Sequence, residues 1–417
     1  MKVIQIGPPL ARLGGPAGYL DQLASAKAEP SEHEVLFPPK AIPQPKPKPT
    51  LTEKLRKQAG QIKRSVLGAP TFYRPTEAEL QTKNGLLDRM FQGVVEQNLE
   101  SSAETIRLAL ASPDAPVLFT HDPFVAEHLL EHRLAGQQIW LIIHAPFPVA
   151  LYIAWCWGVP ERDWRDVLAF PDVQRWTERE LNVWRNVDRL ILPCAEAGEE
   201  FLRIDPRFDE CLNNVTYLMT GGAGTKSQKT GLSKSALRAE WKLPVDIPLG
   251  LYLGNDQPYR GLDTLLAALP HLPSEQALPG QIVLAGPNPE KLPQHPRVRA
   301  LGRVADVSSL LQAVDFVINV NRFSLFDLST IEALETAKPL LLHATGGNKT
   351  FRDLGAGCVM MPDLSPEAIA AGLDAMFSMS QCELARMTER SRRCYADHLT
   401  PAHLWQRHQE LYSRYAT

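Results

Sequence analysis

Residues 251–269 read LYLGNDQPYRGLDTLLAAL. An apolar run, a loop with two glycines and a run with helical apolar spacing predict a strand, a turn and a helix. A glycine-containing loop that leads into a helix presents backbone N–H groups to an anion. Arg260 stands one residue before that helix and adds a cation suited to paired phosphate contacts. A plain turn with an exposed arginine explains the same residues, so the stretch predicts the fold and leaves the ligand open.

Short apolar runs alternate with helical patterns on both sides of this stretch. The expected strands are Val3–Ile6, Val35–Phe37, Val117–Phe119, Trp140–Ile143, Arg189–Leu192, Leu249–Leu253, Gln281–Leu284, Phe316–Val320 and Pro339–His343. The expected helices are 86–110, 123–135, 173–187, 261–269, 306–313, 327–336 and further helices from 365 onward. Such alternation indicates parallel sheets with crossover helices. The sequence therefore predicts an α/β protein with two Rossmann-like, doubly wound domains.

The domain boundary is expected in a segment rich in Gly, Ser, Thr and Lys that shows no apolar periodicity. We place an N-terminal domain at 1–220, this linker at 221–247, a second domain at 248–397 and a closing amphipathic helix at 398–417.

Composition excludes several classes of protein. The 417 residues are 44% hydrophobic and carry a net charge of −3, which argues against disorder and against a nucleic-acid binder that works through bulk charge. The six cysteines form no C-x-x-C pair, and we expect reduced thiols in a cytoplasmic protein. Residues 139–159 carry no charged side chain over a length that could span a bilayer. His144, Pro146 and Pro148 interrupt that segment, so a buried strand, a loop and a helix fit better.

A second group of polar residues follows the expected strand at 316–320. Arg322, Ser324, Asp327 and Lys349 all fall at the carboxyl ends of expected strands, where open parallel sheets bind ligands. Ser324 and Asp327 also fit an S-x-x-D capping box at a helix start, which does not exclude binding.

Short motifs in the second half occur in a family-specific order. They are Leu253-Gly254, Arg260-Gly261, Leu301-Gly302-Arg303-Val304-Ala305-Asp306, Ser324-Leu325-Phe326-Asp327, Glu332-Ala333 and Lys338-Pro339. In this order they resemble the nucleotide-binding domain of the retaining GT-B glycosyltransferases, especially glycosyltransferase family four. The first half is similar to the acceptor domain of that family through Gly14-Gly15, His121-Asp122, His144 and Glu180 to Asp188. The resemblance implies a GT-B fold whose C-terminal helix crosses back to the N-terminal domain.

The resemblance also implies roles for single residues. Glu332 would hold the ribose hydroxyls, the backbone of Val304 would meet the base, and Arg260 would stand on the diphosphate. Gly14 and Gly15 would approach the same phosphates, and His144 would lie beside the transferred sugar, although a lone His in an apolar run is more often a core residue. We therefore expect His144 and Arg260 to be catalytic. The expected donor-binding set is Gly14, Gly15, Asn255, Arg260, Val304, Arg322, Ser324, Phe326, Asp327, Leu328, Glu332 and Lys349.

Two positions depart from the family pattern. Asn255 stands where an arginine is usual, and Ser324 stands where the first glutamate of the E-x7-E pair is usual. Asp327 is the candidate for the missing carboxylate, and Lys349 or Arg322 is the candidate for the missing charge.

The function implied is sugar transfer, with retention, from a nucleotide-diphosphate donor to the hydroxyl of a glycan or lipid-linked acceptor in cell-surface polysaccharide or glycolipid assembly. No Asp-x-Asp motif or His/carboxylate cluster suits a divalent ion, so we expect no metal and no cofactor. The basic segment 46–64 is a candidate for peripheral contact with the inner membrane surface, with a solvated helix as the alternative. A nucleotide-sugar epimerase of the same fold and a non-catalytic subunit that binds an active partner remain open.

Overall fold

A computed structural model describes residues 1–10, 15–27, 31–40, 85–222 and 231–415. Gly14 and the basic segment 46–64 lie outside the described residues, as does part of the expected linker. Gly15 is the first residue of helix α1 (Gly15–Ala26).

The first sheet has six strands in the order β2-β1-β3-β4-β5-β6. Their bounds are Lys2–Ile6 (β1), Glu34–Leu36 (β2), Val117–Thr120 (β3), Gln138–Ile142 (β4), Arg189–Leu192 (β5) and Val215–Tyr217 (β6). The pairs β1–β2, β1–β3 and β3–β4 are parallel. Strands β1, β3 and β4 are almost completely buried, because helices cover parallel sheets on both faces.

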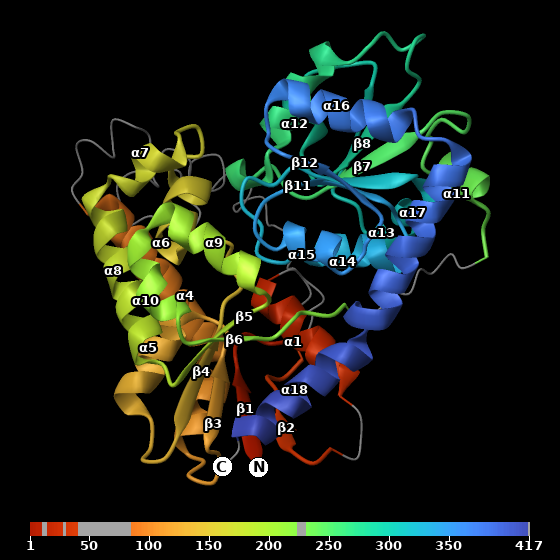
Figure 1. Cartoon of the computed structure of the whole chain (residues 1–417). Coiled ribbons are helices and arrows are strands. Elements are labelled where there is room, and N and C mark those ends of the chain that lie inside the picture. The colour runs from red at the N-terminus through yellow and green to blue at the C-terminus, as the bar shows by residue number, and fades with distance from the viewer. Residues whose placement is uncertain (11–14, 28–30, 41–84, 223–230, 416–417) are drawn as a thin grey trace, which may run out of the picture. The chain divides into compact units, whose positions relative to one another are not determined.

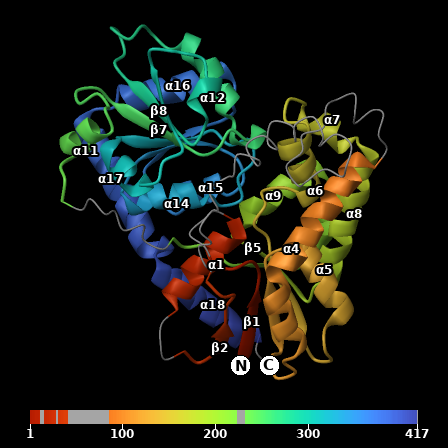
Figure 2. The same cartoon turned by 180° about the vertical axis from the view of Figure 1, so that it is seen from behind.

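Helices α4 (Leu86–Leu110), α5 (Pro123–His132) and α8 (Pro171–Asn186) pack beside one another (Figure 2). The shorter helical elements of this half are α6 (Val149–Leu151), η1 (Tyr152–Gly158), α7 (Trp164–Leu168), α9 (Ala195–Ile204), η2 (Pro206–Phe208) and α10 (Asp209–Leu212). Residues 139–159 thus form a strand, a loop and a short buried helix, as expected. No described helix is both long enough and apolar enough to cross a membrane.

The second sheet also has six strands, in the order β12-β11-β10-β7-β8-β9, and all five pairings are parallel. The strands are Leu249–Leu253 (β7), Gln281–Ala285 (β8), Val298–Gly302 (β9), Phe316–Asn319 (β10), Leu340–His343 (β11) and Cys358–Met361 (β12). The helices are α11 (Lys234–Glu240), η3 (Pro258–Arg260), α12 (Leu262–Ala268), η4 (Leu269–His271), η5 (Pro289–Lys291), α13 (Val307–Ala313), α14 (Leu328–Glu335), α15 (Asn348–Asp353), α16 (Pro366–Phe377), α17 (Gln381–Cys394), η6 (Tyr395–Leu399) and α18 (Pro401–Tyr415).

Two apolar layers hold this second sheet between its helices. Helices α12 and α16 cover one face, and α13, α14 and α15 cover the other (Figure 1). Successive residues of one strand alternate between the layers. Leu251 packs in the layer under α13, α14 and α15, and Tyr252 packs in the layer under α12 and α16. This alternation is the period-two pattern of a strand buried on both faces. The predicted class, two Rossmann-like doubly wound domains, is confirmed.

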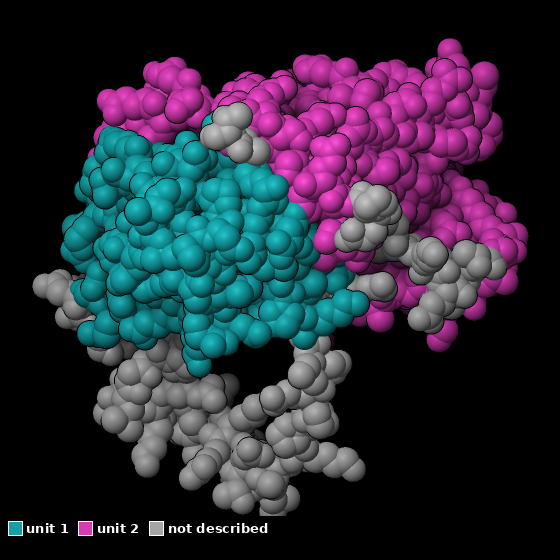
Figure 3. All heavy atoms as spheres, turned by 90° about the horizontal axis from the view of Figure 1, so that it is seen from below, with its two compact units in different colours: residues 1–21, 34–190 teal, residues 22–33, 191–417 magenta. Residues whose placement is uncertain are grey.

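Contacts divide the chain into two units, residues 1–21 with 34–190 and residues 22–33 with 191–417 (Figure 3). The division differs from the boundary expected at 221–247. Helix α9 contacts α15 and therefore belongs to the second unit. The expected linker contains α11, which packs on α13. In the second unit, α18 meets residues 22–33: His33 Nε2 lies 2.9 Å from Ser413 Oγ.

Candidate functional site

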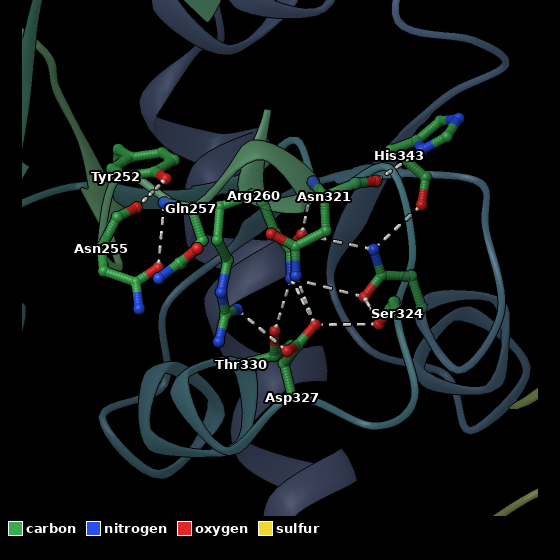
Figure 4. A network of polar contacts seen from close by, with 11 residues as sticks. Tyr252, Asn255, Gln257, Arg260, Asn321, Ser324, Asp327, Thr330 and His343 are labelled. Carbon is green, nitrogen blue, oxygen red and sulfur yellow. Dashed lines mark hydrogen bonds and ion pairs between the residues drawn. The ribbon is translucent and has the colours of Figure 1, made fainter. Parts of the chain in front are cut away.

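The carboxyl ends of β10 and β11 carry a network of polar side chains centred on Asp327 (Figure 4). Asp327 Oδ2 accepts hydrogen bonds from Asn321 Nδ2 at 2.7 Å and from Ser324 Oγ at 2.8 Å. Asn319 Nδ2 lies 3.2 Å from the same oxygen. Asp327 Oδ1 accepts from Arg260 Nη1 at 3.0 Å, which makes a salt bridge. Four donors therefore fix one carboxylate and, through it, one guanidinium.

Arg260 reaches this network from the turn between β7 and α12. The next residue, Gly261, has a φ of 68°, and a Cβ there would lie 2.0 Å from the carbonyl oxygen of Val320. Only glycine permits this approach, which brings the turn against the end of β10. Burial alone would lower the pKa of Arg260, but neighbouring Tyr259 and the carboxylate of Asp327 outweigh it and raise that pKa. Arg260 Nε is buried and has no hydrogen-bond partner in the described part of the chain.

The capping box that Ser324 and Asp327 also fit in the sequence does not form. Asp327 occupies the N-cap position of α14, but its side chain accepts no hydrogen bond from the helix backbone. Ser324 lies outside that helix, is completely buried and donates to Asp327 instead. The carboxylate therefore stabilises Arg260 and the loop rather than the helix N-terminus.

The two other cations of this strand edge are held in ion pairs. Arg322 makes two contacts with Asp263, at 2.9 and 2.6 Å. Lys349 pairs with Glu199 of α9. Both residues therefore lie at the expected edge, with their charges compensated by carboxylates.

Helix α9 makes contacts with α15 and with the loop before it that the sequence did not predict. Thr350 Oγ1 donates to Glu196 at 2.7 Å, and Thr345 Oγ1 donates to Glu200. Burial raises the pKa of Glu200, which also pairs with Arg203. In the sequence, α9 could be recognised only as a short acidic helix. Its partners lie about 150 residues away, so no local pattern indicates these contacts.

Glu332 differs from these paired carboxylates. It lies in α14, and no hydrogen bond or ion pair joins its carboxylate to another described residue. Burial, with a smaller contribution from Glu335, raises the pKa of Glu332 to about 7. Such a carboxylate is available to accept hydrogen bonds from a ligand.

The remaining residues expected to bind a donor take varied positions. Asn255 is exposed, and its side chain accepts from Gln257 N at 3.3 Å. Val304 is half-buried after β9, and Leu328 begins α14. Phe326 is buried and stacks on Phe351, with ring centroids 4.3 Å apart. Ser324 and Phe326 thus support the loop, whereas Asn255 is accessible.

In the first unit, His144 follows β4, is half-buried and ends a row of polar side chains. His144 Nε2 lies 2.7 Å from His121 Nδ1, and His121 Nε2 lies 2.8 Å from Gln5 Oε1. Burial lowers the pKa of His144 to about 3, so the imidazole is neutral at physiological pH. Within the described ranges, no group of three or more His, Cys, Asp or Glu side chains is arranged to hold a metal ion.

Sequence comparison identifies a family over part of the chain. Residues 248–378 match the family described as Glycosyl transferases group 1. Granule-bound starch synthase 1 of Triticum aestivum is 29% identical over 163 residues, which are 36% of this chain and 25% of the synthase. The UDP-N-acetylglucosamine–N-acetylmuramyl-(pentapeptide) pyrophosphoryl-undecaprenol N-acetylglucosamine transferase of Synechococcus sp. (strain JA-3-3Ab) is 34% identical over 161 residues, 36% of this chain and 43% of that protein. The aligned part therefore spans less than half of either relative.

Solved structures resemble the chain over almost its whole length. Sucrose-phosphate synthase from Thermosynechococcus elongatus has a TM-score of 0.64 at 17% identity, covering 99% of this chain and 98% of that one. HepE of Anabaena, solved in complex with UDP-glucose, has a TM-score of 0.60 at 14% identity, covering 99% and 100%. The chain therefore has the two-domain GT-B fold, and its residues 248–378 match the Glycosyl transferases group 1 family.

Proposed function

We propose that the protein is a glycosyltransferase that moves a sugar from a nucleoside-diphosphate donor to a hydroxyl acceptor with retention of configuration. The observation that carries the proposal is Arg260. It is fixed by Asp327 beside a glycine turn, within the region that matches the Glycosyl transferases group 1 family. A fixed cation at a helix start suits a diphosphate.

The donor is proposed to bind at the carboxyl ends of β7, β9 and β10. Arg260 contacts the diphosphate, the unpaired carboxylate of Glu332 accepts the ribose hydroxyls, and the backbone near Val304 meets the base. HepE was solved with UDP-glucose, so a UDP-sugar is the first donor to test. In the first unit, His144 is proposed to contact the transferred sugar.

The proposed chemistry needs no protein nucleophile. The bond between the anomeric carbon and the phosphate oxygen breaks, and the acceptor oxygen bonds to the same face of that carbon. The leaving phosphate oxygen takes the proton of the acceptor hydroxyl. Negative charge grows on the departing diphosphate, and a preorganised cation stabilises it. Arg260 supplies this cation, so we propose that transfer requires neither a metal ion nor a cofactor.

The proposed setting is the assembly of cell-surface polysaccharide or glycolipid in the cytoplasm, on a glycan or lipid-linked acceptor. Contact with the inner membrane surface through segment 46–64 is part of this proposal. Binding to anionic liposomes at low salt, weakened by added salt, is the expected behaviour of such a segment.

A non-catalytic binding subunit is the second candidate. Arg322 and Lys349 are both neutralised by carboxylates, and Ser324 is buried in place of the family glutamate. The ion pairs reduce the positive charge available to a leaving diphosphate, and Ser324 lacks the carboxylate that would hold the sugar. Such a subunit would bind a nucleotide without turning over its sugar.

Replacing Arg260 tests the proposal. Loss of one charge-stabilising donor costs about 3 kcal/mol in the transition state, so Arg260→Ala should lower kcat on UDP-sugars about a hundredfold. Arg260→Lys should retain part of the activity, because it keeps the charge without the paired geometry. Arg392→Ala is the control, since Arg392 pairs with Glu389 at an exposed position of α17. Near-normal turnover by a folded Arg260→Ala variant would overturn the assignment.

A further inference from the structure

Three hydrogen-bonded side chains cross the carboxyl ends of adjacent strands in the first unit. Gln5 lies in β1, His121 directly follows β3, and His144 follows β4. Gln5 Oε1 is 2.8 Å from His121 Nε2, and His121 Nδ1 is 2.7 Å from His144 Nε2. Because these strands are neighbours in the sheet, the row needs no intervening element.

The chemistry of the atoms gives the row a direction. The amide oxygen of Gln5 can only accept, so His121 Nε2 carries a proton. A neutral imidazole has one N–H group, which leaves His121 Nδ1 as an acceptor. His144 Nε2 must then donate to it. The other ring nitrogen of His144, Nδ1, is left with a lone pair.

Burial of the row opposes a charged imidazole. Gln5 is completely buried and His121 is 4% exposed. The ring of Tyr19 packs edge-on against His144 at 4.9 Å and lies 5.6 Å from His121. Burial alone lowers the pKa of His144, which shows that this pocket opposes an imidazolium.

The carboxylates near this pocket have other partners. Asp122 accepts from Phe124 N and Val125 N, each at 2.9 Å, and so caps α5. Glu180 of α8 accepts from Val149 N at 2.7 Å. Both carboxylates bind helix N-termini, so the hydrogen bonds of His144 come from the row itself.

Nδ1 of His144 is the open end of the row. His144 is half-buried, and in the ranges that the structure describes this nitrogen has no hydrogen-bond partner. An imidazole nitrogen with a lone pair accepts a hydrogen bond from a hydroxyl group and repels another acceptor.

We propose that Gln5 and His121 are positioning residues that hold His144 with Nδ1 as the acceptor for a substrate hydroxyl. The identity of that hydroxyl, a sugar hydroxyl, rests on the proposed glycosyltransferase function. The orientation of His144 does not rest on it. The row thus selects a ligand that donates a hydrogen bond at this point.

Nitrogen NMR tests the orientation without any substrate. In the ¹⁵N-labelled wild-type protein at neutral pH, we expect His144 to show protonated Nε2 and unprotonated Nδ1, with its signals assigned by their loss in His144→Asn. Protonation of His144 Nδ1 in the wild type would overturn the proposal, whatever the enzyme does.

Gln5→Met tests whether Gln5 orients the row, because methionine has a similar length and lacks the carbonyl acceptor. His144 should then populate both neutral tautomers, with the proton on Nδ1 or on Nε2. The kcat on a UDP-sugar should fall about tenfold, which is the effect of losing one hydrogen bond. KM for the nucleotide sugar should change by less than about twofold. Gln92→Met makes the same exchange at an exposed position of α4 and should leave both readouts unchanged.

The outcomes separate this proposal from the function. An unchanged His144 spectrum in Gln5→Met would overturn the positioning role of Gln5. If Gln5→Met does not fold, the wild-type spectrum still decides the orientation. The expected spectra together with no turnover of any nucleotide sugar would contradict the glycosyltransferase proposal and leave the row standing.

Discussion

Asp327 shows how much one residue organises at the edge of the second sheet. It accepts three hydrogen bonds on Oδ2 and the Arg260 guanidinium on Oδ1. One lone pair of Oδ1 remains for a sugar hydroxyl, which is the role that the sequence suggested.

Asp327→Asn should separate this role from stability. The amide leaves Arg260 without its counter-charge and faces buried donors with an N–H group, so we expect a loss of about 1–3 kcal/mol in unfolding free energy. Turnover of UDP-sugars should fall further than the affinity for UDP. Asp315→Asn is the matched control, since Asp315 binds Arg238 at 2.6 Å and is equally buried at the amino end of β10. Equal turnover in the two variants, measured well below both melting temperatures, would reduce Asp327 to a structural residue.

If Glu332 holds the ribose as proposed, donor binding should depend on pH. Burial raises the pKa of Glu332 to about 7, and only the ionised form accepts two ribose hydroxyls fully. The affinity for UDP-glucose should therefore rise as the pH increases from about 6 to 8. In Glu332→Gln the affinity should be lower and independent of pH over that range. A wild-type affinity that is flat or falls with pH, measured by calorimetry, would contradict this assignment.

The central strands and the edge strand β2 could be predicted from the sequence, but the other three edge strands could not. Strand β5 and helix α4 have the expected bounds, because their apolar patterns are uninterrupted. The edge strands β6, β9 and β12 were not expected. Their residues are mostly half-buried, so their apolar patterns are diluted.

Long-range contacts were equally beyond sequence reasoning. The position of Arg260 beside a glycine turn was predicted from a local motif, but its partner Asp327 stands 67 residues away. The contacts of α9 with α15 and the row from Gln5 to His144 likewise join distant segments. The fold and the motif positions are thus local properties of the sequence, whereas the pairing of charges depends on the folded chain.

The pH dependence of stability tests how deeply Glu180 is buried between α6 and α8. Burial raises the pKa of Glu180 to about 8, above its value in an unfolded chain. Its contribution to stability is therefore fully present below about pH 4.5 and is lost as the pH rises toward 8, by up to about 1.4 kcal/mol per pH unit.

Glu180→Gln should abolish that loss. Urea unfolding at pH 5 and pH 8 should show a smaller decrease in stability for Glu180→Gln than for the wild type. Glu178→Gln changes an exposed residue of the same helix and should behave like the wild type. An identical decrease in all three proteins would mean that Glu180 ionises freely in the folded state.

The whole molecule combines two parallel sheets, each with polar side chains at the carboxyl ends of its strands. The second unit offers Arg260 and the unpaired Glu332, and the first unit offers His144. Open α/β sheets bind ligands at this edge. The proposed function assigns donor binding to the polar residues of the second unit.

The most direct test is incubation of the protein, in EDTA, with a panel of UDP- and other nucleotide sugars, followed by analysis of products. We expect the nucleoside diphosphate to be released from one donor by transfer or slow hydrolysis. The rate should be the same in EDTA as without it, and about a hundredfold lower in Arg260→Ala. An isomerised sugar, nucleotide binding without any product, or activity that appears only when manganese or magnesium is restored would contradict it.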